Sequence, residues 1–291
     1  MKSNDMMLDV SSAAGLDETI HIAATLHLPD DVPSDRLHLI FALHGGGYSR
    51  IYWHPRFADE SYSFARWFTA KGKAVVTIDM LGMGESSRPE PENRLTSKIL
   101  AAVQADALRQ IVAELERPLS VTGIGHSMGG MMIIAQAAAH PAFDRVGVLG
   151  WANEPMILGD TDVATLQAGL IPSGYLLTAR EPMRMLFYWP DVPKTLIDAD
   201  EAHASATPVT LGRDALTPGI VHQASASIRV PVLVVQSAID TSPAPEKELA
   251  YFSGSPSVEL QLVEDAAHCQ NFAGTRTKHW AELNDWIDRT S

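Results

Sequence analysis

The chain has 291 residues, of which 46% are hydrophobic, and its formal net charge is −13. This length allows two domains or one large α/β domain. The acidic balance argues against nucleic acid and anionic membrane surfaces as partners, because both would repel the protein.

No segment of the sequence indicates export or membrane insertion. Residues 1–10 lack the apolar core of a secretory signal, and no stretch approaches the roughly 18 consecutive apolar residues of a membrane span. The single cysteine, Cys269, excludes an internal disulfide and fits a reducing compartment. We therefore expect a cytoplasmic protein that does not bind membranes. The oligomeric state stays open, and a homodimer is one option.

Strands and helices alternate along most of the chain. The first two strands form an expected antiparallel pair, and the later strands are short, apolar and followed by amphipathic segments. This alternation predicts a mostly parallel sheet with helices on both faces. The predicted strands are residues 7–10, 20–28, 37–43, 74–79, 119–125, 146–151, 230–236 and 258–263. The predicted helices are residues 61–71, a long helix capped by Thr96, and residues 128–139, 243–251 and 275–288.

Residues 152–227 interrupt this alternation. The segment has no clear strand, several prolines and many large side chains. We interpret it as a helical cap over the sheet, which divides the chain into a first core part (1–151), the cap (152–227) and a second core part (228–291). Its large side chains either line a pocket or only pack the cap; they are Met156, Tyr175, Met183, Met185, Phe187, Tyr188 and Trp189.

The pentapeptide Gly125-His126-Ser127-Met128-Gly129 matches the G-x-S-x-G pattern of a nucleophile elbow. A predicted strand precedes it and a predicted helix follows it. A serine on such a tight turn projects its hydroxyl where a base can reach it, and the helix start places free amides and a positive dipole end beside it. The pattern therefore predicts Ser127 as a nucleophile.

A serine hydroxyl needs a base, and eleven histidines compete for that role. His268 is favoured because it follows the strand 258–263 through a short loop, which places it at the carboxyl edge of a parallel sheet, where Ser127 also lies. Asp240, after the strand 230–236, is our choice for the carboxylate that orients the imidazole. Glu154, after the strand 146–151, is the alternative.

The order Ser127, Asp240, His268 resembles that of the α/β-hydrolase family, and the resemblance extends over almost the whole chain. Two further segments carry it, His44-Gly45-Gly46-Gly47 and residues 79–86. The resemblance implies a sheet of about eight strands with the cap after the sixth. It also implies an oxyanion hole formed by the backbone amides of Met128 and Gly46, with help from Gly45 or Gly47, and a structural role for His44.

A glycine-rich run after a strand could instead cradle phosphate. However, Gly45-Gly46-Gly47 lacks the lysine and hydroxyl residue of a P-loop, and no H-E-x-x-H or Cys-His cluster suggests a metal. We expect neither a metal nor a cofactor.

A serine at the elbow, where relatives that dehalogenate or open epoxides have aspartate, indicates acyl chemistry. We expect hydrolysis of a carboxylic ester, or else a lactone, with a medium-sized apolar group. The expected substrate-binding residues are Gly45, Gly47, Tyr48, Trp53, Trp151, Tyr188 and Trp189.

Three alternatives stay open at this point. Relatives that hydrolyse a carbon–carbon bond in vinylogous diketones share the triad and often the sequence Ser-Met-Gly-Gly, which is present here at 127–130. Acyl transfer to an alcohol or amine is the second. The third is a binding protein on the same scaffold, for which an intact triad would serve no purpose.

Overall fold

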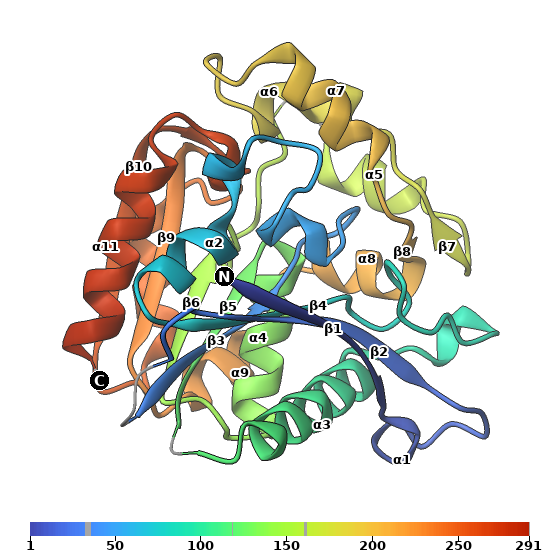
Figure 1. The fold of residues 1–291 in the computed structure, drawn as a ribbon. Helices are drawn as coiled ribbons and strands as arrows, with labels where there is room; N and C mark the ends of the chain where they lie inside the picture. Colours follow the sequence, from blue (N-terminus) through green and yellow to red (C-terminus); the bar gives the residue numbers. More distant parts are fainter. Residues whose placement is uncertain (33–35, 118, 160–161, 291) are drawn as a thin grey trace.

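An eight-stranded sheet forms the centre of the molecule (Figure 1) in a computed structural model that describes residues 1–32, 36–117, 119–159 and 162–290. The strand order is β1-β2-β4-β3-β5-β6-β9-β10. β2 runs antiparallel to both neighbours, and the six strands β4, β3, β5, β6, β9 and β10 are parallel to one another. The strands are β1 (Lys2–Asp9), β2 (His21–Leu28), β3 (Leu37–Leu43), β4 (Ala74–Ile78), β5 (Leu119–His126), β6 (Arg145–Leu149), β9 (Val232–Ile239) and β10 (Val258–Ala267). The predicted fold class is confirmed.

The central strands are apolar throughout because both faces of the sheet are covered. Along β3, Leu39 and Phe41 enter one hydrophobic core, whereas Ile40 and Ala42 enter a second core on the opposite face. The first core is packed by α1 (Ser11–Ala14), α3 (Ser97–Leu115) and α4 (Met128–Ala139), and the second by α2 (Phe64–Ala70) and α11 (Arg276–Arg289).

Helix starts follow their capping residues. The Thr96 side chain accepts a hydrogen bond from the Ile99 amide at the start of α3, as predicted. Ser63 caps α2 in the same way, so this helix begins later than the predicted residue 61. The predicted helix 243–251 is instead a single α-helical turn, α10 (Pro245–Glu248), followed by the 3₁₀-helix η5 (Leu249–Phe252).

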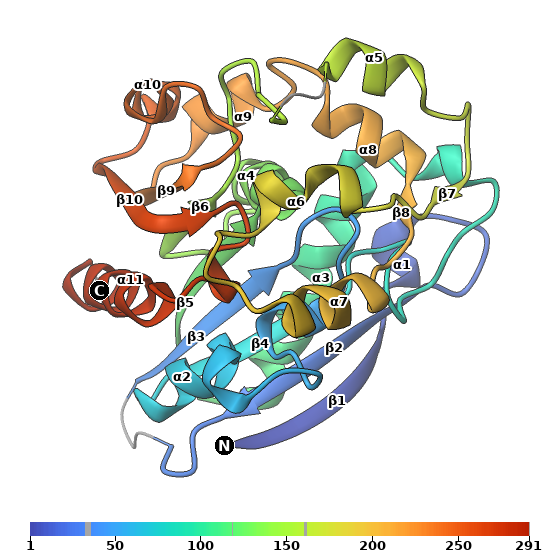
Figure 2. The ribbon, with the colours of Figure 1, turned by 90° about the horizontal axis from the view of Figure 1, so that it is seen from above.

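The segment between β6 and β9 lies over the carboxyl ends of the strands (Figure 2). Its helices are α5 (Val163–Ala168), α6 (Arg184–Phe187), α7 (Lys194–Ala202), α8 (Val209–Ala215) and α9 (His222–Ser227). The predicted cap has no strand, but the structure has a short antiparallel pair, β7 (Tyr175–Leu176) and β8 (Thr207–Pro208). The last helix, α9, packs on α4 and η5, so it joins the core helices and not the part over the sheet.

The remaining 3₁₀-helices are single turns in loops: η1 (Arg50–Trp53), η2 (Glu60–Tyr62), η3 (Glu92–Arg94), η4 (Glu181–Met183) and η6 (Gln270–Phe272). Within the described ranges, no helix combines the length and the apolar character needed to cross a membrane.

Candidate active site

Ser127 lies on a sharp turn between β5 and α4. Its backbone has φ 56° and ψ −124°, a conformation that non-glycine residues adopt only where the surrounding structure enforces it. The neighbouring glycines are required by close packing. A Cβ on Gly125 would come within 2.0 Å of the Gly129 carbonyl oxygen, and one on Gly129 would come within 2.5 Å of the His44 carbonyl oxygen. The elbow therefore needs both glycines of the motif.

His268 and Asp240 are joined at the same edge of the sheet. His268 follows β10 and Asp240 follows β9, and His268 Nδ1 lies 2.6 Å from Asp240 Oδ1. The Asp240 carboxylate is itself fixed by the backbone amides of Ser237 and Thr241, each at 2.8 Å. With Nδ1–H donating to the carboxylate, Nε2 is the nitrogen that can accept a proton.

The alternative carboxylate, Glu154, lies elsewhere. Its Oε1 accepts a hydrogen bond of 2.6 Å from the Tyr251 hydroxyl, and its backbone amide points to Glu248. Glu154 is not among the described residues that line the cavity around Ser127. The geometry thus pairs His268 with Asp240 and not with Glu154.

Gly46 and Met128, whose amides are the predicted oxyanion donors, both line the cavity that Ser127 lines. The Gly45 carbonyl accepts hydrogen bonds from His44 Nδ1 (2.8 Å) and from the Tyr48 amide (3.3 Å), so the Gly46 N–H, on the opposite side of the same trans peptide, points the other way. Met128 begins α4, where an amide has no intrahelical acceptor. A Cβ on Gly46 would lie 3.4 Å from Met128 Cε, and both residues line the cavity. The two predicted oxyanion donors therefore belong to neighbouring residues at one cavity.

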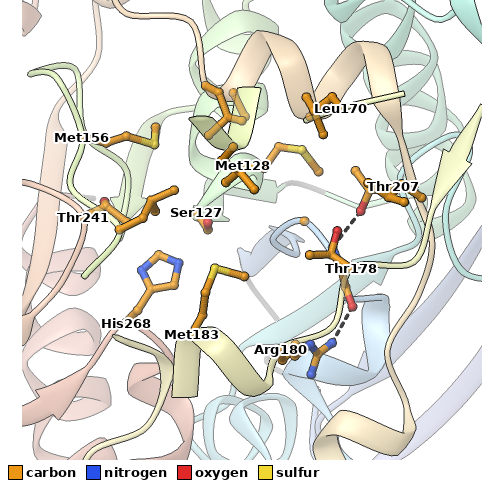
Figure 3. A pocket seen from close by; sticks show the side chains of 18 of the residues that line it. Ser127, Met128, Met156, Leu170, Thr178, Arg180, Met183, Thr207, Thr241 and His268 are labelled. Atoms are coloured by element: carbon orange, nitrogen blue, oxygen red, sulfur yellow. Dashed lines mark hydrogen bonds between the residues drawn. The ribbon is translucent and has the colours of Figure 1, made fainter. Parts of the chain in front are cut away.

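A cavity of about 520 Å³ lies between this edge of the sheet and the segment above it (Figure 3). Ser127 and His268 lie on its floor, and its walls are mostly apolar. The walls include Trp151, Met156, Leu158, Leu166, Leu170, Leu176, Met183, Phe187, Val209 and Leu216.

The model of the "Alpha/beta hydrolase family" matches residues 39–280. The chain belongs to the α/β-hydrolase family. The predicted family is thereby confirmed.

Solved structures of α/β hydrolases share the fold over almost the entire chain. An esterase from Thermogutta terrifontis has 16% identity and a TM-score of 0.69, with 99% of each chain covered. Proline iminopeptidase from Mycobacterium smegmatis has 16% identity and a TM-score of 0.66, with 99% of this chain and 98% of that chain covered. A bromoperoxidase from Bacillus anthracis has 20% identity and a TM-score of 0.62, with 99% of each chain covered. None of the curated protein sequences compared with the chain matches it.

The structure places only some of the predicted substrate-binding residues at the hydrolase cavity. Gly47 and Trp151 line it. Gly45 lies behind the nucleophile, where a Cβ would be 3.1 Å from Ser127 Cβ. The predicted contacts of Tyr48, Trp53, Tyr188 and Trp189 are corrected, because these rings pack into the second hydrophobic core. Tyr48 and Trp53 come after β3 in sequence and Tyr188 and Trp189 come after α6, but none of the four lines the cavity.

Sequence reasoning missed His126. Its Nε2 lies 2.8 Å from the His268 carbonyl oxygen, to which it donates, and its ring is fully buried. Burial, reinforced by the nearby His268, holds the pKa of His126 well below its usual range. His44 is also neutral, because burial lowers its pKa; its Nδ1 supports Gly45 and its Nε2 accepts from the Met80 amide. The structural role expected for His44 fits these bonds.

No group of three or more His, Cys, Asp or Glu side chains that could hold a metal occurs in the part of the chain that the structure describes. Cys269 is buried, and its Sγ lies 3.1 Å from the Tyr48 hydroxyl. Burial raises the pKa of the Cys269 thiol, so it is protonated and unreactive at neutral pH.

Proposed function

We propose that the protein hydrolyses carboxylic esters through an acyl-enzyme on Ser127. The observation that carries this proposal is the 2.6 Å contact between His268 and Asp240 at the cavity that Ser127, Gly46 and Met128 also line. A nucleophile, a base, an orienting carboxylate and oxyanion donors in these places support acyl transfer as the reaction type.

Ser127 Oγ attacks the ester carbonyl carbon while its proton passes to His268 Nε2. Asp240 stabilises the resulting imidazolium. The negative charge on the carbonyl oxygen is bound by the Gly46 and Met128 amides, each worth about 3 kcal/mol of transition-state stabilisation. The alcohol then leaves with the proton from His268, and a water activated by the same imidazole releases the acid and restores Ser127.

The cavity supports an apolar, uncharged substrate of medium size. Its walls are dominated by Leu, Met, Val and aromatic side chains. Arg180 is the one permanently positive side chain among the described wall residues, and Asp200 neutralises it at 2.5 Å. A carboxylated dienoate of the carbon–carbon cleavage type would bring an anion to a site without a free cation. We therefore favour an ester over that substrate, with a lactone as the next choice.

Active-site labelling tests the nucleophile. A fluorophosphonate probe should label the wild-type protein on the peptide that contains Ser127, and Ser127→Ala should lose the label while keeping the wild-type melting temperature. Absence of both labelling and turnover would favour a binding protein on the hydrolase scaffold.

A substrate panel tests the class of bond. Esters with hexanoyl or aryl acyl groups should be hydrolysed faster than acetates, and a vinylogous diketone dienoate should not be cleaved. Product analysis with an added alcohol acceptor separates hydrolysis from acyl transfer. Preference for acetate would contradict a roomy apolar site.

The single buried cysteine supports a cytoplasmic location as part of this proposal.

A further inference from the structure

Arg180 joins the cap to the loop that carries the Gly46 amide. It precedes η4, and its side chain is only 3% exposed. Nη1 donates to Asp200 Oδ2 at 2.5 Å, and Nη2 donates to the Gly47 carbonyl oxygen. The guanidinium also lies over the Tyr48 ring, 3.7 Å from its centroid. Arg180 is therefore held between the cap and two residues of the loop.

Asp200, on α7, collects three donors at one oxygen. Besides Arg180, its Oδ2 accepts from the Tyr48 hydroxyl (2.9 Å) and from the Tyr188 hydroxyl (2.6 Å). Tyr48 follows Gly47 directly and also contacts Cys269, the residue after the catalytic base. The cap, the loop that carries Gly45, Gly46 and Gly47, and the loop that carries His268 thus meet at this buried carboxylate.

The Gly47 peptide groups are held by residues of the cap. The Gly47 N–H donates to Thr207 Oγ1 at 2.8 Å, and its carbonyl accepts from the Ser205 amide at 2.9 Å as well as from Arg180. In Figure 3, Thr207 and Arg180 lie across the cavity from His268. Since its N–H is occupied, Gly47 is a poor oxyanion donor, and Gly46 is left as the donor on this loop.

A buried ion pair contributes little to stability on average, because desolvation offsets the Coulomb attraction. Its geometry can nevertheless fix a neighbouring group. The core holds the Gly45 carbonyl through His44, and the cap holds Gly47 through Arg180 and Thr207, so the Gly46 amide between them is fixed from both sides.

We propose that Arg180, with Asp200 as its counter-ion, is a positioning residue that aims the Gly46 amide at the developing oxyanion. The inference rests on the proposed esterase function. Arg180 acts through Gly47 and does not contact the reacting atoms. Its loss should therefore weaken the binding of the transition state more than the binding of the substrate.

Thionoesters provide a readout that a purely structural role would not change. A thiocarbonyl sulfur is a weak hydrogen-bond acceptor, so the ratio of kcat/KM for an ester to that for its thionoester measures the oxyanion hole. Arg180→Met should lower kcat/KM for the ester about 10- to 100-fold, mostly in kcat, with a much smaller effect on the thionoester. The ratio should therefore fall.

Arg184→Met is the matched control. Arg184 also pairs with a carboxylate in the cap, with Nε and Nη2 each 2.6 Å from Glu201, although this pair is more exposed than that of Arg180. Within the described chain it has no hydrogen bond to the loop that carries Gly45, Gly46 and Gly47. This variant should keep the wild-type ratio and lie within about twofold of the wild-type rate. If Arg180→Met does not fold, Thr207→Val, which removes only the acceptor of the Gly47 amide, should lower the ratio in the same way.

The outcomes separate the two proposals. A wild-type enzyme that hydrolyses esters, together with an unchanged ratio in Arg180→Met, or in Thr207→Val where Arg180→Met does not fold, would overturn the positioning role alone. A wild-type protein without ester turnover would overturn the esterase function and this role with it.

Discussion

The ring of His126 donates a 2.8 Å hydrogen bond from Nε2 to the main-chain carbonyl of His268. The residue before Ser127 thereby holds the loop that carries His268, although the two lie 142 positions apart in sequence. The His126 ring stacks on Tyr52, with centroids 4.7 Å apart, and burial keeps it neutral by lowering its pKa. A neutral ring with its proton on Nε2 fits a carbonyl acceptor.

His126→Phe should keep the ring packing and lose this bond. The His268 carbonyl would then keep only the Gln270 amide, at 3.1 Å, as a donor, and loss of the His126 bond costs about 0.5–1.5 kcal/mol of stability. We expect a lower melting temperature and a fall in kcat with little change in KM, because the base is displaced and the apolar walls are not. His126→Gln retains a donor and should recover part of kcat. Wild-type kcat in His126→Phe would show that the bond does not position the base.

Asp240→Asn should leave the fold intact and lower kcat on the order of 10⁴-fold, because the amide favours the wrong tautomer of His268 and cannot stabilise the imidazolium. Glu154→Gln is the control, since Glu154 bonds Tyr251 instead. Steady-state kinetics on one ester, with circular dichroism to verify folding, compares the two. A larger loss in Glu154→Gln would reverse the assignment of the acid.

The sheet and the elbow could be predicted from the sequence because their signals are local. Apolar runs such as residues 37–43 must be buried on both faces, and Gly125 and Gly129 flank a turn that excludes any Cβ. His268 and Asp240 could be placed because the carboxyl ends of parallel strands share one edge.

The walls of the cavity could not be predicted, because they depend on contacts between distant segments. Tyr48 and Tyr188 are large and follow strand ends or cap turns, but both point their hydroxyls at Asp200, which the sequence does not single out. The Arg180 bond to Gly47 joins residues 133 positions apart and has no periodic signal. Aromatic size therefore indicated burial correctly, but it indicated contact with the cavity correctly for Trp151 and wrongly for Tyr48 and Tyr188.

The stability of the protein should fall as the pH decreases from about 6.5 to about 3. Burial lowers the pKa of His279 from 6.5 to about 3, so across this window the unfolded state binds the proton and the folded state does not. One such group makes unfolding easier by up to about 1.4 kcal/mol per pH unit. His27 and His38, whose pKa values burial also lowers to about 3, add to the effect.

His279→Leu isolates one contribution. The free energy of unfolding, measured with urea at several pH values, should depend less on pH in this variant than in the wild type. Between pH 6 and 4 its slope against pH should be smaller by up to about 1.4 kcal/mol per pH unit. Above pH 7 the wild-type and variant curves should run parallel, because the ring is uncharged in both states. Parallel curves at every pH would mean that His279 is protonated equally in the folded and unfolded protein.

Gly212 offers a way to reduce the cavity without disturbing its walls. It lies in α8 and lines the cavity, and a Cβ built on it meets no atom within 4 Å. Gly212→Leu should therefore fill space that a bulky acyl group would occupy and lower kcat/KM for aryl or hexanoyl esters about tenfold. Acetate esters, which leave that space empty, should be hydrolysed at close to the wild-type rate. Gly212→Ala is the control, since it makes the same change to helix propensity with one methyl group and should keep the wild-type acyl preference. If Gly212→Leu slows acetate and hexanoate equally, the bulky group binds elsewhere and the cavity is not the acyl site.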